Sequence, residues 1–205
     1  MTGHGTLVET TLLLGSPRAG SRTAGIAVRL VDELSLALAA EGVELAGPDV
    51  VDLADIGAGL PLRASRSVPL GPETERALDL VRRPGLLVVV SPTFKGTYTG
   101  LLKLFLDMLP LDGLAGCVGV GAMTAGWAKH RGAGDQYLRP LLQELGAVVP
   151  VPCLSILEEE FEDVPEVVAA WSRRWASALG AVARHLRHHD LSAPEVHPLT
   201  GARAS

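Results

Sequence analysis

Short apolar runs alternate along this chain with longer stretches in which apolar residues recur every three or four positions. The short runs predict strands at residues 7–14, 43–53, 86–90, 117–122 and 148–156. The longer stretches predict helices at residues 22–41, 72–83, 100–109, 136–145 and 165–188, several of which end at a glycine or a proline. Because a helix follows every strand, we expect an α/β fold, a doubly wound parallel sheet with right-handed crossovers.

The strands are expected at different depths in this sheet. Residues 86–90 form the most apolar run, which is typical of a central strand buried on both faces. A Gly-Pro pair at residues 47–48 interrupts the second run, and Pro150 and Pro152 occur in the last one, so both are expected at edges. The segment at residues 54–72 is rich in Gly, Pro, Ser and Arg and is expected to be an irregular connection.

The first predicted strand leads into a helix through a loop of small and basic residues. A helix N-terminus behind such a loop offers free backbone N–H groups and the positive end of the helix dipole to an anion. Hydroxyl and guanidinium donors gather here, namely Ser16, Arg18, Ser21, Arg22 and Thr23. The loop matches neither a Walker A sequence nor a G-x-G-x-x-G motif, so it suits a terminal phosphomonoester such as that of FMN. The alternative is an ordinary turn with a helix N-cap.

Two further loops, at residues 91–99 and 123–135, follow the third and fourth predicted strands. In a doubly wound sheet the loops at the carboxyl ends of the strands meet at the topological switch point, where ligands bind. Pro92 fixes the backbone of the second loop, while Gly96 and Gly100 permit close approach of a flat ring. The three loops together predict a bound nucleotide-like cofactor.

Three blocks of sequence at these positions resemble the NAD(P)H-dependent FMN reductase family, which has a flavodoxin-like fold. They are Gly15-Ser16-Pro17-Arg18 with Ser21, then Ser91-Pro92-Thr93-Phe94-Lys95-Gly96 with residues 98–103 and 106–110, and finally residues 137–142 with 144–147. Together the blocks span about residues 7–156. The resemblance implies a five-stranded parallel sheet in the order 2-1-3-4-5, with the strands numbered along the chain.

The resemblance also implies roles for individual residues. Ser16, Arg18, Ser21 and Thr23 would hold the FMN phosphate. Pro92, Thr93, Phe94, Lys95 and Gly96 would flank the isoalloxazine ring, and Thr124 and Gly126 would face it from the third loop. Plain packing for Phe94 and a solvated charge for Lys95 are the alternatives. No catalytic side chain is expected, because hydride transfer from nicotinamide to flavin is chemistry of the cofactors themselves.

The third loop departs from the family pattern, in which a small Gly-rich turn continues smoothly into a helix. Gly132 and Gly134 would each cost about 1 kcal/mol inside a helix, so we expect the helix to begin later with Asp135 as its N-cap. A mobile flap hinged at these glycines would bring Lys129 and Arg131 to the phosphates of NAD(P)H. The alternative is a solvated basic loop.

Composition narrows the class of function. A formal charge of −5 at pH 7 over 205 residues argues against nucleic acid as a partner. No apolar run reaches the length of a membrane span, and the N-terminus lacks the regions of a signal peptide, so we expect a cytoplasmic protein without a membrane partner. We expect a single domain over residues 1–190 and a disordered tail at residues 191–205.

The remaining reactive residue types carry less information. Cys117 and Cys153 lie in apolar segments and are expected to be buried thiols. The acidic run at residues 158–160 is expected to be a solvated loop. Three histidines, His185, His188 and His189, lie close together near a predicted helix end, where the helix dipole favours them, and no metal site is expected.

These observations predict an NAD(P)H-dependent FMN reductase that supplies reduced flavin to a partner monooxygenase. The alternatives are a reductase that retains FMN and reduces a quinone or an azo compound, and a flavodoxin-like electron carrier without NAD(P)H turnover. The helix at residues 100–109 is apolar on two faces, one with Leu101, Leu104, Phe105 and Met108 and the other with Leu102, Leu106 and Leu109. Because a monomer needs one such face, we expect a homodimer or homotetramer through this helix, as the resemblance also implies.

Overall fold

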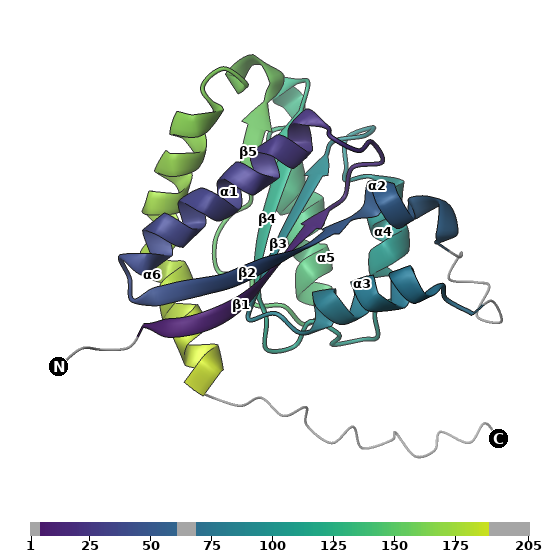
Figure 1. Cartoon of the computed structure of the whole chain (residues 1–205). Coiled ribbons are helices and arrows are strands. Elements are labelled where there is room, and N and C mark those ends of the chain that lie inside the picture. The colour runs from purple at the N-terminus through teal and green to yellow at the C-terminus, as the bar shows by residue number, and fades with distance from the viewer. Residues whose placement is uncertain (1–4, 61–68, 189–205) are drawn as a thin grey trace, which may run out of the picture.

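A computed structural model describes residues 5–60 and 69–188 of the chain. Five parallel strands form one sheet in the order β2-β1-β3-β4-β5, which confirms the predicted flavodoxin-like topology (Figure 1). Their bounds are β1 Thr6–Leu14, β2 Val43–Asp52, β3 Leu86–Pro92, β4 Val118–Ala125 and β5 Leu154–Leu157. β3 is the central strand, and all its side chains except that of Pro92 are buried, as its apolar run predicted.

Helices cover both faces of the sheet (Figure 1). Their bounds are α1 Arg22–Ala39, α2 Leu53–Ile56, α3 Pro72–Arg82, α4 Gly100–Leu106, α5 Arg139–Glu144 and α6 Val164–His188. Apolar side chains of α1 and α6 cover one face, and those of α3, α4 and α5 cover the other. Side chains of β3 alternate between the two layers, so Val88 and Val90 belong to the first and Leu87 and Val89 to the second. The sheet therefore divides the core into two apolar layers.

The strand predicted at residues 148–156 is much shorter in the structure. β5 begins at Leu154, and Val148 forms only a single bridge to β4. Pro150 and Pro152 have no N–H group to donate, so the segment that contains them cannot join the ladder. The edge position that these prolines predicted is confirmed.

β2 is the other edge strand, as its Gly-Pro interruption predicted. The register between β1 and β2 shifts between Glu9 and Thr11, because β2 carries one extra residue there. Gly47 has a φ of +99°, and a Cβ at this position would lie 2.9 Å from the carbonyl oxygen of Thr10. The bulge therefore requires glycine.

The segment at residues 54–72 is not irregular throughout, so that prediction was wrong for its first part. α2 and a 3-10 turn at Gly57–Gly59 occupy it, and Asp52 caps α2 by accepting a hydrogen bond from the Ala54 amide at 2.9 Å. Residues 61–68 and the predicted tail at 191–205 lie outside the described residues.

Both cysteines are free and buried, as predicted. No helix within residues 5–60 and 69–188 is both long enough and apolar enough to cross a membrane. Over the same residues no group of three His, Cys, Asp or Glu side chains could hold a metal ion. The side chain of His188 and the whole of His189 fall outside the described part of the chain.

Candidate functional site

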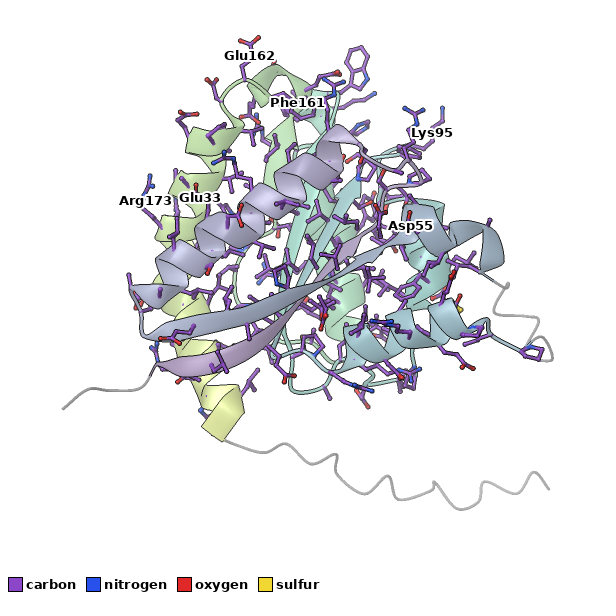
Figure 2. All side chains as sticks on the ribbon, in the orientation of Figure 1. Glu33, Asp55, Lys95, Phe161, Glu162 and Arg173 are labelled. Carbon is purple, nitrogen blue, oxygen red and sulfur yellow. The ribbon has the colours of Figure 1, made fainter. Side chains whose placement is uncertain are left out.

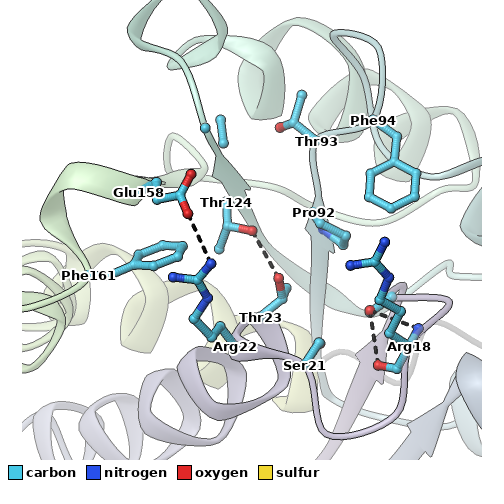
Figure 3. Close-up of a pocket in the computed structure, with 13 residues that line it drawn as sticks. Arg18, Ser21, Arg22, Thr23, Pro92, Thr93, Phe94, Thr124, Glu158 and Phe161 are labelled. Carbon is cyan, nitrogen blue, oxygen red and sulfur yellow. Dashed lines mark hydrogen bonds and ion pairs between the residues drawn. The ribbon is translucent and has the colours of Figure 1, made fainter.

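A cleft of about 290 Å³ lies where the loops after β1, β3 and β4 meet, at the carboxyl end of the sheet (Figure 3). Most residues predicted for the cofactor line it, namely Ser16, Arg18, Ser21, Arg22, Thr23, Pro92, Thr93, Phe94, Thr124 and Gly126. Ala125, Glu158 and Phe161 complete the wall. Parallel strands end at the same edge of a sheet, and this brings segments far apart in the sequence to one place.

The loop between β1 and α1 has the geometry of an anion cradle. Ser21 is the N-cap of α1, and its Oγ accepts a hydrogen bond from the Ala24 amide at 3.3 Å. The amides of Arg22 and Thr23 are the first of the helix and have no intrahelical acceptor. Ser16 Oγ accepts from the Arg18 amide at 3.2 Å, which folds the loop over the end of β1. The free amides and the positive end of the α1 dipole lie at one end of the cleft.

The two arginines of this loop differ in their partners. Within the described residues the Arg18 guanidinium forms no hydrogen bond or ion pair, and it lies beside Pro92 and Phe94 in Figure 3. Arg22 donates to Glu158 Oε1 at 2.9 Å, and its guanidinium carbon lies 4.8 Å from the centre of the Phe161 ring. Arg18 is therefore the arginine with free donors for a ligand.

Hydroxyl groups join the three loops to one another. The Oγ1 atoms of Thr23 and Thr124 lie 2.9 Å apart and link the start of α1 to the end of β4. The Thr93 amide donates to the Thr124 carbonyl at 2.7 Å. Thr99 caps α4 with its Oγ1 and donates the same hydroxyl to the carbonyl of Gly15. These bonds position the walls of the cleft without help from a ligand.

One buried polar atom in the cleft lacks a partner. Thr93 Oγ1 is buried, and it forms no hydrogen bond with any described group. Such a group is costly unless a ligand satisfies it. The polar edge of an isoalloxazine ring can do so, and the free donors at the other end of the cleft suit a phosphate. The residues present therefore fit FMN.

The loop after β3 reverses direction between Phe94 and Thr97, whose backbones exchange two hydrogen bonds. Lys95 and Gly96 have φ values of +54° and +91°, the signature of a type I′ turn. They form the tip of the loop outside the cleft wall, and Lys95 projects away from the body of the protein (Figure 2). Their predicted contact with the flavin ring stays a prediction. Phe94 is 43% exposed at the rim, so plain core packing does not account for it.

The segment after β4 is helical for most of its length. A 3-10 turn at Ala128–His130 precedes a π-helix at Gly134–Leu138, which continues into α5. The Arg139 amide donates to the Gly134 carbonyl, five residues back. Pro140 has no N–H group for the carbonyl of Gln136, and the wider turn accommodates its ring.

The predicted N-cap at Asp135 was wrong. The helical segment begins before Asp135, whose Oδ1 instead accepts a hydrogen bond from the Cys153 amide at 2.9 Å. Gly134 is buried, and a Cβ on it would lie 2.7 Å from Cys153 Cβ, whereas a Cβ on Gly132 would meet nothing within 4 Å. The structure thus gives Gly134 a packing role against the segment before β5.

The acidic turn after β5, at Glu158–Glu160, exposes Glu158 and Glu159, as predicted for a solvated loop, but two of its carboxylates also form ion pairs. Glu158 pairs with Arg22 in the cleft wall, and Glu160 accepts two hydrogen bonds from Arg131, at 2.9 and 3.1 Å. Partial burial opposes ionisation of Glu160, but the hydrogen bonds from Arg131 and the Leu157 amide hold its pKa below the ordinary value. No local pattern reveals these pairs, because each joins residues distant in the sequence.

Comparisons with known proteins agree with this geometry. The family model described as NADPH-dependent FMN reductase matches residues 8–162, which contain the whole cleft wall. The NADH-dependent FMN reductase SfnF of Pseudomonas fluorescens is 32% identical over 151 residues, which cover 74% of this chain and 77% of that protein. The NADH-dependent FMN reductase SfnE of Pseudomonas putida is 29% identical over 180 residues, which cover 87% and 93%.

Solved structures of oxidoreductases have a similar fold. An oxidoreductase from Corynebacterium diphtheriae superposes with a TM-score of 0.70 at 27% identity, covering 89% of this chain and 99% of that one. An NADH:FMN oxidoreductase in its apo form superposes with a TM-score of 0.65 at 28% identity, covering 92% of each chain. The fold, the three loops around the cleft and the extent of the family match lead to one conclusion: this chain belongs to the NADPH-dependent FMN reductase family.

Proposed function

We propose that this protein is an NAD(P)H-dependent FMN reductase, with FMN bound in the cleft described above. Family membership supports the type of reaction. The observation that carries the proposal is the arrangement of the cleft, with free donors for a phosphate at one end and an unsatisfied buried hydroxyl further along the wall. FMN, when bound, supplies the acceptor for the hydride of the reduced nicotinamide.

The phosphate end is built by the loop between β1 and α1. Ser16 and Ser21 offer hydroxyl groups, the amides of Arg22 and Thr23 point out of the helix start, and Arg18 offers a planar guanidinium fork. This set would place a doubly charged phosphate on the positive end of the α1 dipole.

The ring end is built by the loops after β3 and β4. The Thr93 hydroxyl would bind the polar edge of the ring, and Phe94 and Pro92 would pack against the ring. No histidine, cysteine, lysine or tyrosine lines the cleft among the described residues. The role of the chain is therefore to bind and orient both cofactors and to leave one ring face accessible, without proton transfer by a side chain.

Arg18→Ala tests the position of the phosphate. Loss of a charge-assisted fork should weaken FMN binding by about 1.5–3 kcal/mol, which is about 10- to 150-fold. Riboflavin, which lacks the phosphate, should bind equally to both proteins in a fluorescence-quenching titration. Arg29→Ala is the matched control, because Arg29 lies further along α1 and pairs with Glu33 outside the cleft. Equal losses for FMN and riboflavin would contradict the proposal.

The fate of the reduced flavin is also part of the proposal: we propose that it leaves the cleft for a partner monooxygenase, as the family resemblance implies. NAD(P)H oxidation that requires added FMN, from a protein that loses FMN on gel filtration, supports this. Retention of FMN together with turnover of a quinone or azo compound would favour the retained-cofactor alternative. A flavin that NADPH does not bleach under anaerobic conditions would favour an electron carrier.

We propose further that the protein self-associates through α4. Leu102, Phe105 and Leu106 are buried within the chain, so Phe105 belongs to the buried face and not to the outer one. Leu101 packs against the same apolar layer beside Gly57, whereas Leu104 is only partly buried and is not part of that layer. A second copy that covers the outer face around Leu104 would complete its burial.

Leu104→Glu tests this interface by light scattering coupled to gel filtration. A carboxylate in an apolar interface should shift the protein toward monomer. Leu36→Glu is the control, since Leu36 is 70% exposed on α1, in the other helix layer. An unchanged assembly in Leu104→Glu, or a monomeric wild type, would refute the interface.

A further inference from the structure

Arg22 begins α1 beside the anion cradle, where a second phosphate ligand is expected, but its guanidinium binds Glu158 instead. Its guanidinium turns toward the opposite wall of the cleft and donates to Glu158 (Figure 3). The ring of Phe161 lies against the same guanidinium at 4.8 Å and adds a cation–π contact.

The ion pair between Arg22 and Glu158 lies at the surface of the cleft. One hydrogen bond joins the two groups, and their side chains are 71% and 56% exposed. Exposed pairs of this type contribute about 0–1 kcal/mol to stability, so removal of Glu158 should free Arg22 without unfolding the chain. A freed guanidinium can form a bidentate contact with a phosphate dianion.

Glu158 also places a negative charge in the cleft that would receive the phosphate. Its side chain lines the cleft, and its Oε2 would lie 3.5 Å from a Cβ on Gly126. The carboxylate therefore opposes the phosphate in two ways, by holding Arg22 and by its own charge. Arg18 is left as the arginine with free donors in the cleft.

We propose that Glu158 is a specificity-determining residue that lowers the affinity of the cleft for FMN by withholding Arg22 from the phosphate. This inference rests on the proposed function, since it concerns the same phosphate. A flavin held by one arginine instead of two dissociates more readily, which suits a reductase that must release its reduced flavin.

The experiment measures the dissociation constants of FMN and riboflavin for the full chain by fluorescence titration, and it reports their ratio. Glu158→Gln should tighten FMN about three- to tenfold and leave riboflavin unchanged, so the ratio of the riboflavin constant to the FMN constant rises. Arg22→Ala in the wild-type background leaves the Glu158 charge in the cleft without its partner, so it should lower the ratio, but less than Arg18→Ala does. The double variant should lose most of the gain, because only the smaller part that comes from removal of the carboxylate charge does not require the released Arg22.

Glu159→Gln is the matched control. It removes the same charge at the adjacent position, but Glu159 is exposed and does not line the cleft. Its ratio should equal that of the wild type. An equal gain in this variant would attribute the effect to net charge and overturn the inference.

Three other outcomes would overturn it as well. The ratio could stay constant or fall in Glu158→Gln, the gain could persist in full in the double variant, or Arg22→Ala alone could weaken FMN as strongly as Arg18→Ala. In each case a wild type that binds FMN more tightly than riboflavin would leave the proposed function intact. A wild type that does not distinguish the two flavins would refute the phosphate site and this inference together.

Discussion

Thr99→Val removes one hydroxyl group at the point where two loops of the cleft are joined. Thr99 is 2% exposed, and its Oγ1 donates to the Gly15 carbonyl and accepts from the Leu102 amide at 3.1 Å as the N-cap of α4. Valine has nearly the same shape and fills the same space. The substitution therefore leaves a buried carbonyl and a buried amide without their partner, and little else changes.

The expected loss follows from these two bonds. Loss of an N-cap costs about 1 kcal/mol, and a buried carbonyl left without a donor costs about 1–3 kcal/mol. The hydrogen bond from the Leu102 amide is the N-cap bond itself, so its loss contributes to the sum only once. Thr99→Val should therefore lower the free energy of unfolding by about 2–4 kcal/mol, measured by urea denaturation with circular dichroism and an unchanged m-value.

Thr99→Ser is the matched control, because serine keeps the hydroxyl and loses only a methyl group. It should recover most of the difference between Thr99→Val and the wild type. If Thr99→Val unfolds within about 0.5 kcal/mol of the wild type, or if serine and valine are equally destabilising, the two hydrogen bonds do not hold the loops together.

Gly134→Ala should destabilise the protein by about 1–3 kcal/mol, because its Cβ would lie 2.7 Å from Cys153 Cβ, whereas Gly132→Ala, with open space around it, should be neutral or stabilising in the same urea assay. Burial raises the pKa values of the Cys117 and Cys153 thiols to about 12, so at pH 8 only about 10⁻⁴ of each is the reactive thiolate, and neither should react with a disulfide reagent until urea unfolds the chain. The pKa of Glu160 is lower in the folded than in the unfolded chain, so its contribution to stability is present above the ordinary value of 4.5 and is lost as the pH falls through the folded value; Glu160→Gln should make unfolding less dependent on pH in that acidic range, and an unchanged dependence would contradict the pairing with Arg131.

Local patterns in the sequence predicted the type and order of the main strands and helices and the end of the sheet where the cleft lies. The apolar run of β3 and the prolines before β5 marked a central and an edge strand, because burial and the missing proline N–H act at each residue separately. The small and basic residues between β1 and α1 marked an anion cradle, because free amides are a property of any helix start. The rule that ligands bind at the carboxyl ends of parallel strands then brought the three loops together.

The partners of the charged side chains, in contrast, depend on how distant segments meet in the fold. Arg18 and Arg22 are equivalent phosphate ligands in the sequence, but Glu158, 136 residues away, holds one of them. Asp135 had the pattern of an N-cap, yet the amide of Cys153 approaches it across the fold. Local sequence patterns describe only nearby residues, so they cannot indicate a carboxylate or an amide that comes close only when the chain folds. Such contacts are weak, and they form only where the fold places the two groups within hydrogen-bond distance.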